Sequence, residues 1–403
     1  MTKLDSPAFE TYDVVIIGGA MLGSSVAHFL SGNSDFDGRI LVVEMDPSYE
    51  NSSTAHTNSC MRQQFSNEIN IRISQFAADY VKNFRAYMDD DPRVPEVPFQ
   101  SYGYMYLANN PEFAEGLRSA QKVQAALGAG TRYMTPDDIA REYPFYNLQD
   151  ILGANHNLID EGYFDGNTLF DWWKRKAREN GVEYITNEVV GITKNKAGNR
   201  VESVTLKSGN RISCDTLINA SGPRAAITAR MAGIEIPVEP RKRYTFIFDA
   251  ENPLDRDLPL TIDPSGVHTR SDGQYYLAGC PPDEDLPVEP DDFEQDFNIW
   301  EDKAWPAIAN RIPQFEAIKL INSWAGHYAF NAFDQNAILG PHTEVTNFMF
   351  VNGFSGHGFQ QSPAMGRGMA ELIVHGEFRT LDLTPFGFDR ITRNKPFIEK
   401  AVI

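Results

Sequence analysis

The glycine-rich stretch at residues 12–30 (YDVVIIGGAMLGSSVAHFL) is the strongest constraint on how this chain can fold. The apolar run Val14 to Ile17 predicts a buried parallel strand, and the residues that follow the glycines have helical spacing. Small residues between strand and helix let backbone N–H groups approach a pyrophosphate at the helix start. The predicted phosphate-binding turn comprises Gly18, Gly19, Ala20, Met21, Leu22 and Gly23.

The next strand strengthens this interpretation, although Ala20 replaces the second glycine of the G-x-G-x-x-G fingerprint. Residues Arg39 to Val43 form a second apolar run that ends at Glu44. A carboxylate at that position is placed to accept hydrogen bonds from an adenosine ribose. The order of strand, turn, helix, strand and acid predicts a dinucleotide site, for which NAD and FAD are both admissible. The alternative is an ordinary βαβ unit with a glycine-rich loop.

Composition excludes several classes of function. The 403 residues include 36 Lys and Arg against 55 Asp and Glu, a net charge of −19, which disfavours nucleic acid and anionic membrane surfaces as partners. Cys60, Cys214 and Cys280 are widely spaced, which favours neither a disulfide framework nor a metal cluster. No apolar run approaches the roughly 20 residues that span a bilayer. We therefore expect a cytoplasmic protein with no membrane span; its oligomeric state stays open.

The order of predicted elements indicates an α/β chain with two domains. The βαβ opening contrasts with the alternating, turn-punctuated strands after Pro237, which predict an antiparallel sheet. A Rossmann-like domain is expected from residues 1–92, 160–238 and 322–403, and a second domain from residues 93–159 and 239–321. Helices are expected over residues 68–88, 111–127, 291–309 and 362–374, with a strand over 317–324.

The C-terminal block contains a second glycine-rich turn, GFSGHGF at Gly353 to Phe359, between a predicted strand and a predicted helix. Three glycines around a serine and a histidine predict a backbone-lined concavity that can approach a flat ring.

Several motifs together resemble the D-amino-acid-oxidase-like FAD oxidoreductases, over essentially the whole chain. They are the opening turn with Glu44, NASG at Asn219 to Gly222, WAG at Trp324 to Gly326, D-x-x-x-x-x-G at Asp334 to Gly340, and GFSGHGF. The strings MRQQFS, PVEPRKRY, FDQN and GFSGHGFQQ are similar to the branch of sarcosine oxidase, dimethylglycine dehydrogenase and a mitochondrial FAD-containing complex I assembly factor.

This resemblance implies FAD rather than NAD, held by a glutathione-reductase-like domain beside an antiparallel substrate domain. It implies oxidation of a carbon–nitrogen bond by hydride transfer to flavin, followed by hydrolysis of the imine. Val189 would hold the adenine end through its backbone, and Gly353 to Gln360 would line the flavin. The cofactor residues implied beyond the opening turn are Glu44, Ser53, Thr54, His56, Arg62, Gln63, Gln64, Val189, Ala220, Ser221, Gly222, Gly326, Gly353, Phe354, Ser355, Gly356, His357, Gly358, Phe359 and Gln360.

Three arginines are candidates for binding a substrate carboxylate. By resemblance Arg62 lies on the loop that reaches the flavin, where its guanidinium could clasp a carboxylate, pack on the flavin or form a surface salt bridge. Arg241 and Arg243 alternate on a predicted strand, so either could serve instead. Tyr244 and Tyr276 are candidate pocket walls, although aromatic residues on strands are more often core.

His56 is the candidate for a covalent flavin link, because its loop is similar to one whose histidine carries flavin in dimethylglycine dehydrogenases. Ala55 and Ser59 depart from that pattern, and a loop histidine near phosphates is the alternative. The region after Trp324 has His327 in place of the flavin-linking cysteine of sarcosine oxidases. Gln360 replaces their lysine, which puts sarcosine itself in doubt.

The resulting hypothesis is an FAD-dependent oxidoreductase acting on a secondary or N-substituted amino acid, with oxygen or an electron carrier as acceptor. One alternative is oxidation of a 2-hydroxy acid, for which His327 or His357 would be the base. Another is a flavoprotein that binds FAD and acts in assembly or as a scaffold.

Overall fold

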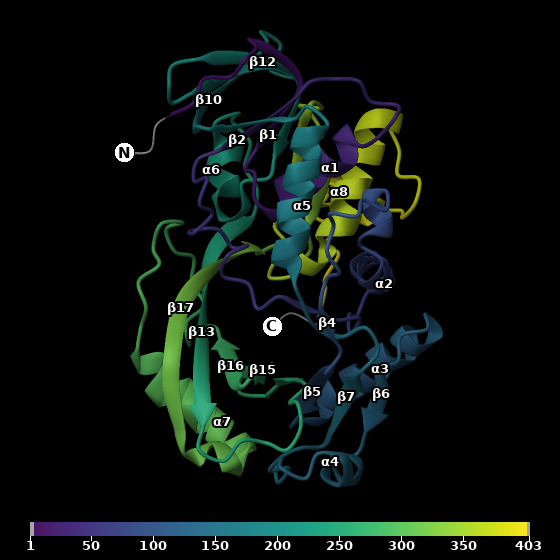
Figure 1. Cartoon of the computed structure of the whole chain (residues 1–403), viewed down its shortest axis with the longest axis vertical. Helices are drawn as coiled ribbons and strands as arrows, with labels where there is room; N and C mark the ends of the chain where they lie inside the picture. The colour runs from purple at the N-terminus through teal and green to yellow at the C-terminus, as the bar shows by residue number, and fades with distance from the viewer. Residues whose placement is uncertain (1–3, 401–403) are drawn as a thin grey trace.

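The computed structural model describes residues 4–400 and contains a mixed sheet built around the opening βαβ unit (Figure 1). Its centre is parallel: β1 pairs with β2 and β12, β2 with β9, and β12 with β19. Buried side chains on both faces of β1 explain the unbroken apolar run. The strands are β1 (Thr11–Ile17), β2 (Ile40–Glu44), β9 (Glu183–Thr186), β10 (Val189–Lys194), β11 (Val201–Leu206), β12 (Arg211–Asn219), β18 (Ile338–Pro341) and β19 (Phe348–Asn352).

Helices α1 (Met21–Ser31), α5 (Gly166–Glu179) and α8 (Gly358–His375) pack together on this sheet, and α2 (Glu68–Lys82) contacts α8. Gly366 of α8 allows the close approach to α1, because a Cβ there would lie 2.0 Å from the Oγ of Ser25. The first helix of the chain and the last long one are thus direct neighbours. Shorter helices are α6 (Ala225–Arg230) and α9 (Asp389–Thr392), with single turns at Ala86–Met88, Gly222–Arg224 and Thr384–Phe386.

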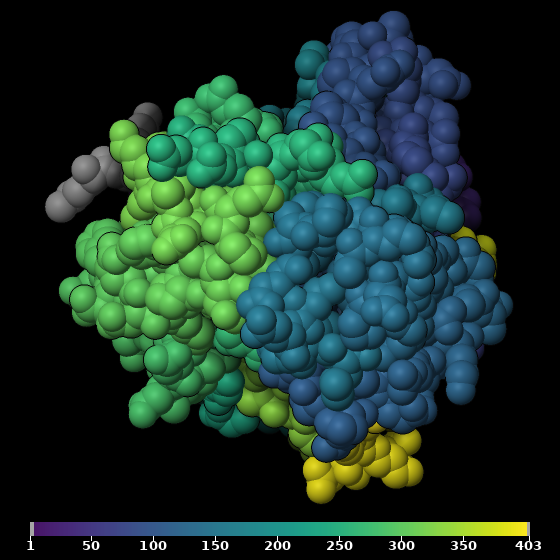
Figure 2. All heavy atoms as spheres, turned by 90° about the horizontal axis from the view of Figure 1, so that it is seen from below, coloured from purple at the N-terminus to yellow at the C-terminus, as the bar shows by residue number. Residues whose placement is uncertain are grey.

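A second, mostly antiparallel sheet runs in the order β17-β13-β16-β15-β14-β5-β7-β6. The long strands β13 and β17 pair along nearly their whole length and dominate one side of the molecule in Figure 1. Figure 2 shows that two segments far apart in sequence, in blue and in green, share the lower face. The strands are β5 (Tyr104–Ala108), β6 (Arg132–Met134), β7 (Gly153–Asn157), β13 (Val238–Ala250), β14 (Leu260–Ile262), β15 (His268–Asp272), β16 (Tyr275–Cys280) and β17 (Ile318–Asn331).

A small sheet, β3-β8-β4, supports the segment that carries Arg62. Its strands are β3 (Cys60–Met61), β4 (Phe99–Gln100) and β8 (Gly162–Phe164). Around the second large sheet lie α3 (Pro111–Ala126), α4 (Pro136–Glu142), a π-helical turn (Trp300–Ala304), α7 (Trp305–Arg311) and a 3-10 turn (Pro313–Glu316).

The predicted helix over residues 291–309 is wrong in its first half, since helix begins only at Trp300. Asp292 accepts a hydrogen bond from the backbone N–H of Glu294, and Asp296 accepts one from Asn298. Such local side-chain bonds compete with helix formation. Three other predicted elements have different limits: α2 ends at Lys82, α8 begins at Gly358, and the strand predicted over 317–324 extends to Asn331.

The predicted fold class is confirmed, because a Rossmann-like α/β unit with a parallel sheet centre is joined to a mostly antiparallel second sheet. The residue boundaries of the two domains stay a prediction. Among residues 4–400, no helix combines the length and the apolar character that crossing a bilayer would need.

Candidate active site

Residues from both large sheets line one cavity of about 380 Å³. It extends from the turn after β1 to the face of the antiparallel sheet that carries Thr245 and His268. The predicted site residues that line it are Gly18, Ala20, Met21, Leu22, Glu44, Ser53, Thr54, His56, Arg62, Val189, Ala220, Ser221, Gly222, Arg243, Tyr244, Gly326, His327 and Gly353 to Gln360. Outside its lining are Gly19, Gly23, Gln63, Gln64, Arg241 and Tyr276.

The turn between β1 and α1 is built for close backbone approach. Gly18 has a φ of +96°, and a Cβ on it would lie 2.6 Å from the carbonyl oxygen of Ala220. A Cβ on Gly23 would lie 1.9 Å from the carbonyl oxygen of Gly18. Helix α1 begins after Ala20 with no capping side chain and no acidic residue in its first turn. Its amino end therefore keeps backbone donors and a positive dipole for an anion.

Glu44 lies at the end of β2 and lines the cavity. One carboxylate oxygen accepts the N–H of Gly19 at 2.8 Å, and the other accepts that of Asp46 at 2.8 Å. Burial is the main reason that the pKa of Glu44 is raised. These backbone bonds fix the carboxylate beside the turn, where it can accept a further bond from a hydroxyl group.

The second glycine turn, between β19 and α8, faces the same cavity. Gly353, Ser355 and Gly356 have positive φ values of 70°, 50° and 91°. The N–H of Ser355 donates to Ala329, and its hydroxyl accepts the N–H of Asn331, which ties the turn to β17. Helix α8 also starts without a capping side chain or an acidic first turn. Two helix amino ends therefore face one cavity, an arrangement that fits a dinucleotide with anionic and electron-accepting parts.

Arg62 is a buried cation in the lining of the cavity. Its guanidinium packs 3.9 Å above the ring of Phe65, and its Nη1 donates to the carbonyl of Gln64. Its Nη2 donates to the Nε2 of His357 at 3.0 Å. Burial and this cation lower the pKa of His357 well below its usual range. His357 is therefore neutral, and its Nε2 lone pair is already occupied by Arg62.

A buried carboxylate that the sequence analysis did not identify accepts hydrogen bonds from the segment after Arg62. Glu161 accepts the N–H of Gln63 at 2.7 Å and the Nε2 of Gln64 at 2.8 Å. Burial raises the pKa of Glu161 to about 7. Gln63 and Gln64 thus position Arg62 and do not line the cavity.

Arg241 and Arg243 lie on the same face of β13, and the structure separates their roles. Arg243 lines the cavity, stacks over Tyr328 and pairs with Asp285 at 2.8 Å. Arg241 stacks over Phe330 and pairs with Glu239 at 3.0 Å, outside the lining. Alternation puts both residues on one face, so only the tertiary structure distinguishes them.

The two candidate wall tyrosines belong to the core on the other face of that sheet. Tyr276 stacks on Phe248, and its hydroxyl accepts the N–H of Leu254. Tyr244 is a buried member of the same hydrophobic cluster, although part of it reaches the cavity. Tyr276 is therefore a core residue and not a wall of the cavity.

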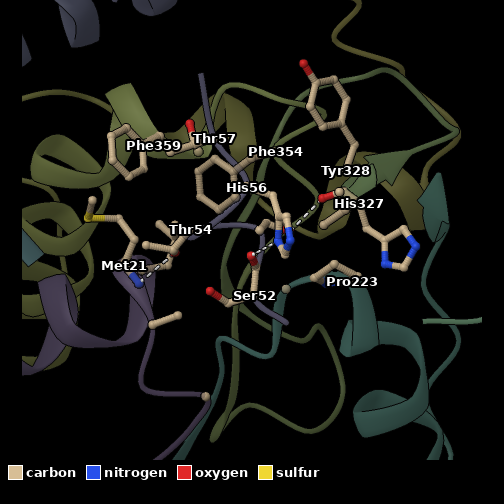
Figure 3. A pocket seen from close by; sticks show the side chains of 18 of the residues that line it. Met21, Ser52, Thr54, His56, Thr57, Pro223, His327, Tyr328, Phe354 and Phe359 are labelled. Carbon is tan, nitrogen blue, oxygen red and sulfur yellow. Dashed lines mark hydrogen bonds between the residues drawn. The ribbon is translucent and has the colours of Figure 1, made fainter. Parts of the chain in front are cut away.

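His56 and His327 both pack against one aromatic ring near the cavity. The ring of Phe293 is 5.6 Å from that of His56 and 4.4 Å from that of His327. The Nδ1 of His56 donates to the carbonyl of Ser52 at 3.0 Å, as Figure 3 shows, and the Nε2 of His327 donates to that of Asp292 at 2.8 Å. The imidazole of His327 turns away from Phe354 in Figure 3. The absence of a side chain at Gly326 leaves room for the loop that carries His56, since a Cβ on Gly326 would lie 2.6 Å from the Cβ of His56.

Sequence reasoning missed many polar residues of the lining, among them Asn58, Thr245 and His268. These three come from a loop and from two strands, β13 and β15, and no local motif links them. Among residues 4–400, no group of three or more His, Cys, Asp or Glu side chains could hold a metal ion.

The fold and the site together define a dinucleotide-binding α/β protein with a cavity shared between a nucleotide sheet and an antiparallel sheet. The family model described as FAD dependent oxidoreductase matches residues 13–372, and the chain belongs to this family, whose cofactor is FAD.

Known proteins agree with this assignment. FAD-dependent oxidoreductase domain-containing protein 1 of Xenopus laevis is 35% identical, covering 98% of this chain and 85% of its own length. Mitochondrial sarcosine dehydrogenase of Homo sapiens is 22% identical over 92% of this chain, but over only 40% of its own length. The crystal structure of L-proline dehydrogenase from P. horikoshii shares the fold, with a TM-score of 0.82, 24% identity, and coverage of 96% of this chain and 99% of that one.

Proposed function

We propose that this protein oxidises the carbon–nitrogen bond of a secondary or N-substituted amino acid. The observation that carries the proposal is the pair of cationic side chains, Arg62 and Arg243, in the lining of the cavity that both glycine turns share. A guanidinium binds a carboxylate with two parallel hydrogen bonds, which fixes position and orientation together. An amino-acid carboxylate held there would place the adjacent carbon–nitrogen bond inside the cavity.

Each end of the cavity would have its own task. The turn at Gly18 to Gly23 and Glu44 would hold the pyrophosphate and ribose of FAD, and the turn at Gly353 to Gln360 would line its flavin. Bound FAD supplies the acceptor for two electrons and a proton. Arg62 would bind the substrate carboxylate, and its contacts with Phe65, Gln64 and His357 hold it in one orientation.

The alternative of 2-hydroxy-acid oxidation needs a base beside the substrate. The Nε2 of His357 accepts a hydrogen bond from Arg62, and burial lowers its pKa, so it is a poor proton acceptor. The Nε2 of His327 donates to a backbone carbonyl, and burial lowers the pKa of this imidazole too. Amine oxidation is less demanding, because the deprotonated amine can be drawn from solution.

Two of the similar proteins carry names that fit the proposal. Sarcosine and proline, named for the human dehydrogenase and for the P. horikoshii enzyme, are both secondary amino acids.

The test is anaerobic mixing of the holoprotein with N-methyl and N-carboxyalkyl amino acids and with 2-hydroxy acids, following loss of the flavin absorption band. We expect bleaching by an N-substituted amino acid, and about 1000-fold slower bleaching in Arg62→Lys, because buried hydrogen bonds to a charged group are lost. Arg72→Lys, an exposed arginine on α2, is the matched control and should bleach as wild type does. Bleaching by hydroxy acids alone, or by nothing, would overturn the proposal.

A covalent bond between His56 and FAD stays a prediction. Precipitation with acid checks it directly, since covalent flavin stays yellow in the pellet and free FAD stays in the supernatant.

A further inference from the structure

His268 is a buried imidazole in the cavity lining with no role in the function proposed above. It lies on β15, directly across from Gly279 on β16, which in turn lies across from Thr245 on β13. A Cβ on Gly279 would lie 2.5 Å from the Nε2 of His268. The missing side chain at Gly279 therefore lets the imidazole lie across the sheet toward Thr245.

The hydrogen bonds of His268 identify which of its nitrogens carries the proton. Asn58 links Thr245 to His268 through its side-chain amide. Its Oδ1 accepts a hydrogen bond from the hydroxyl of Thr245 at 3.4 Å, and its Nδ2 donates one to the Nε2 of His268 at 2.9 Å. With Nε2 as acceptor, the proton of a neutral imidazole is on Nδ1. That Nδ1 is buried and has no hydrogen-bond partner among residues 4–400.

The surroundings of His268 are electropositive. Burial and the guanidinium groups of Arg270 and Arg243 lower its pKa to about 4, so the imidazole is neutral at physiological pH. Arg270 bonds to Asp272 and to the carbonyl of Asn58, and Arg243 bonds to Asp285. The Nε atoms of both arginines are also buried without a partner among the described residues. A buried donor without a partner is costly, so this region favours an acceptor-rich, negatively charged group.

Besides the two helix amino ends, the cavity therefore has two places where side chains attract anions. One is Arg62, which is tied to the second glycine turn through His357. The other is His268, flanked by Arg243 and Arg270 on the antiparallel sheet. A substrate with one carboxylate can occupy only one of them.

We propose that His268 donates a hydrogen bond to a second carboxylate, carried on the N-substituent of the substrate, and so selects N-carboxyalkyl amino acids. This inference rests on the proposed amine oxidation and names the substrate class of the same site. An N-alkyl amino acid of the same size lacks the second carboxylate and would leave the Nδ1–H of His268 unpaired.

The test compares pairs of substrates that differ only in that group. N-carboxymethyl derivatives of glycine, alanine and glutamate are matched by N-isobutyl derivatives, in which two methyl groups replace the two carboxylate oxygens. Rates of anaerobic flavin bleaching give kcat/KM for each member of a pair. We expect the wild type to prefer at least one N-carboxymethyl member, and His268→Leu to lower that preference by about 10- to 100-fold.

Two further variants separate recognition from damage to the fold. His268→Gln restores an amide donor and should recover part of the preference, whereas His342→Leu makes the same change to a half-buried histidine outside the lining and should retain it. A readout without turnover is the dissociation constant of succinate against that of butyrate, from perturbation of the flavin spectrum. We expect His268→Leu to weaken succinate more than butyrate.

The outcomes distinguish the two proposals. Bleaching by no N-substituted amino acid would overturn the amine oxidation itself. Bleaching by both members of each pair with equal kcat/KM, or a preference that His268→Leu leaves intact, would overturn only the role of His268.

Discussion

The two ends of the cavity are built from different parts of the polypeptide. At the end formed by the turn after β1, the surface is mainly backbone, with small residues and the amino end of α1. At the end formed by the antiparallel sheet, it is mainly side chains, including Arg243, His268 and the nearby Arg62. The first end needs one backbone shape, whereas the second needs several side chains from distant segments to meet. A substitution that disturbs the backbone at the first end should therefore abolish FAD binding. Substitutions at the second end should each lower the rate of substrate oxidation by a limited factor.

Gly23→Ala is the change with the largest expected effect, at the backbone-built end. The new methyl group would lie 1.9 Å from the carbonyl oxygen of Gly18, and neither backbone can move without opening the turn. We expect a loss of more than about 3 kcal/mol in stability and a protein purified without FAD. Gly191→Ala is the control, because the nearest atom to its Cβ is 3.7 Å away. Flavin absorbance and urea unfolding measure both, and a yellow, stable Gly23→Ala protein would contradict the close packing.

Glu161→Gln tests the buried carboxylate that supports the side-chain end. Burial raises the pKa of Glu161 from 4.5 to about 7, so the folded protein binds its proton more tightly than the unfolded chain does. The stability this provides is complete below pH 4.5 and is lost as pH rises through 7, by about 3 kcal/mol. Urea unfolding at pH 4.5 and pH 8 should show that decline in the wild type. It should be absent in Glu161→Gln and present in Glu112→Gln, an exposed residue on α3; equal declines in all three would refute the assignment.

A comparison of Arg243→Gln with Arg241→Gln tests whether an arginine at the side-chain end matters because it lines the cavity. Both arginines stack on an aromatic ring and bond to Asp285, but only Arg243 lines the cavity. We expect Arg243→Gln to slow flavin bleaching by about 10- to 100-fold, and Arg241→Gln by less than about threefold. Similar losses in both variants would mean that the strand, and not the cavity, accounts for the effect.

Ala20→Gly has the smallest expected effect, although it restores the usual glycine fingerprint. Ala20 has a φ of −72°, which any residue adopts, so glycine would bring no conformational relief. Removing its methyl group also removes packing against the neighbouring core cluster. We expect the dissociation constant of FAD, measured by rebinding to stripped protein, to change by less than about tenfold. A larger gain in affinity would show that the methyl group obstructs the pyrophosphate.

The backbone-built end could be predicted from sequence because it depends on short, contiguous segments. The local sequence determines the backbone conformation of both glycine turns, Gly18 to Gly23 and Gly353 to Gly358. Glu44 follows its strand directly. The structure gathers these segments around one cavity, and their contacts with FAD stay predictions.

The side-chain end could be predicted only in part, since its residues meet through tertiary structure. Strand alternation places Arg241 and Arg243 on one face but cannot tell which of them reaches the cavity. His268 depends on Gly279 across the sheet and on Asn58, 210 positions away in the sequence. The helix predicted from residue 291 was wrong for a related reason, because aspartate side chains satisfied local backbone donors that a helix would have used.

The packing of α8 against α1 sets the order in which the protein can be completed. Helix α1 is made early, but the helix that covers it ends roughly 340 residues later, a delay of roughly 20 to 70 s at ordinary rates of synthesis. Strand β1 likewise waits for its partner β12. During that interval the nascent chain exposes the apolar surfaces of its first strand and helix, so its time of greatest risk of aggregation comes before its nucleotide site can close.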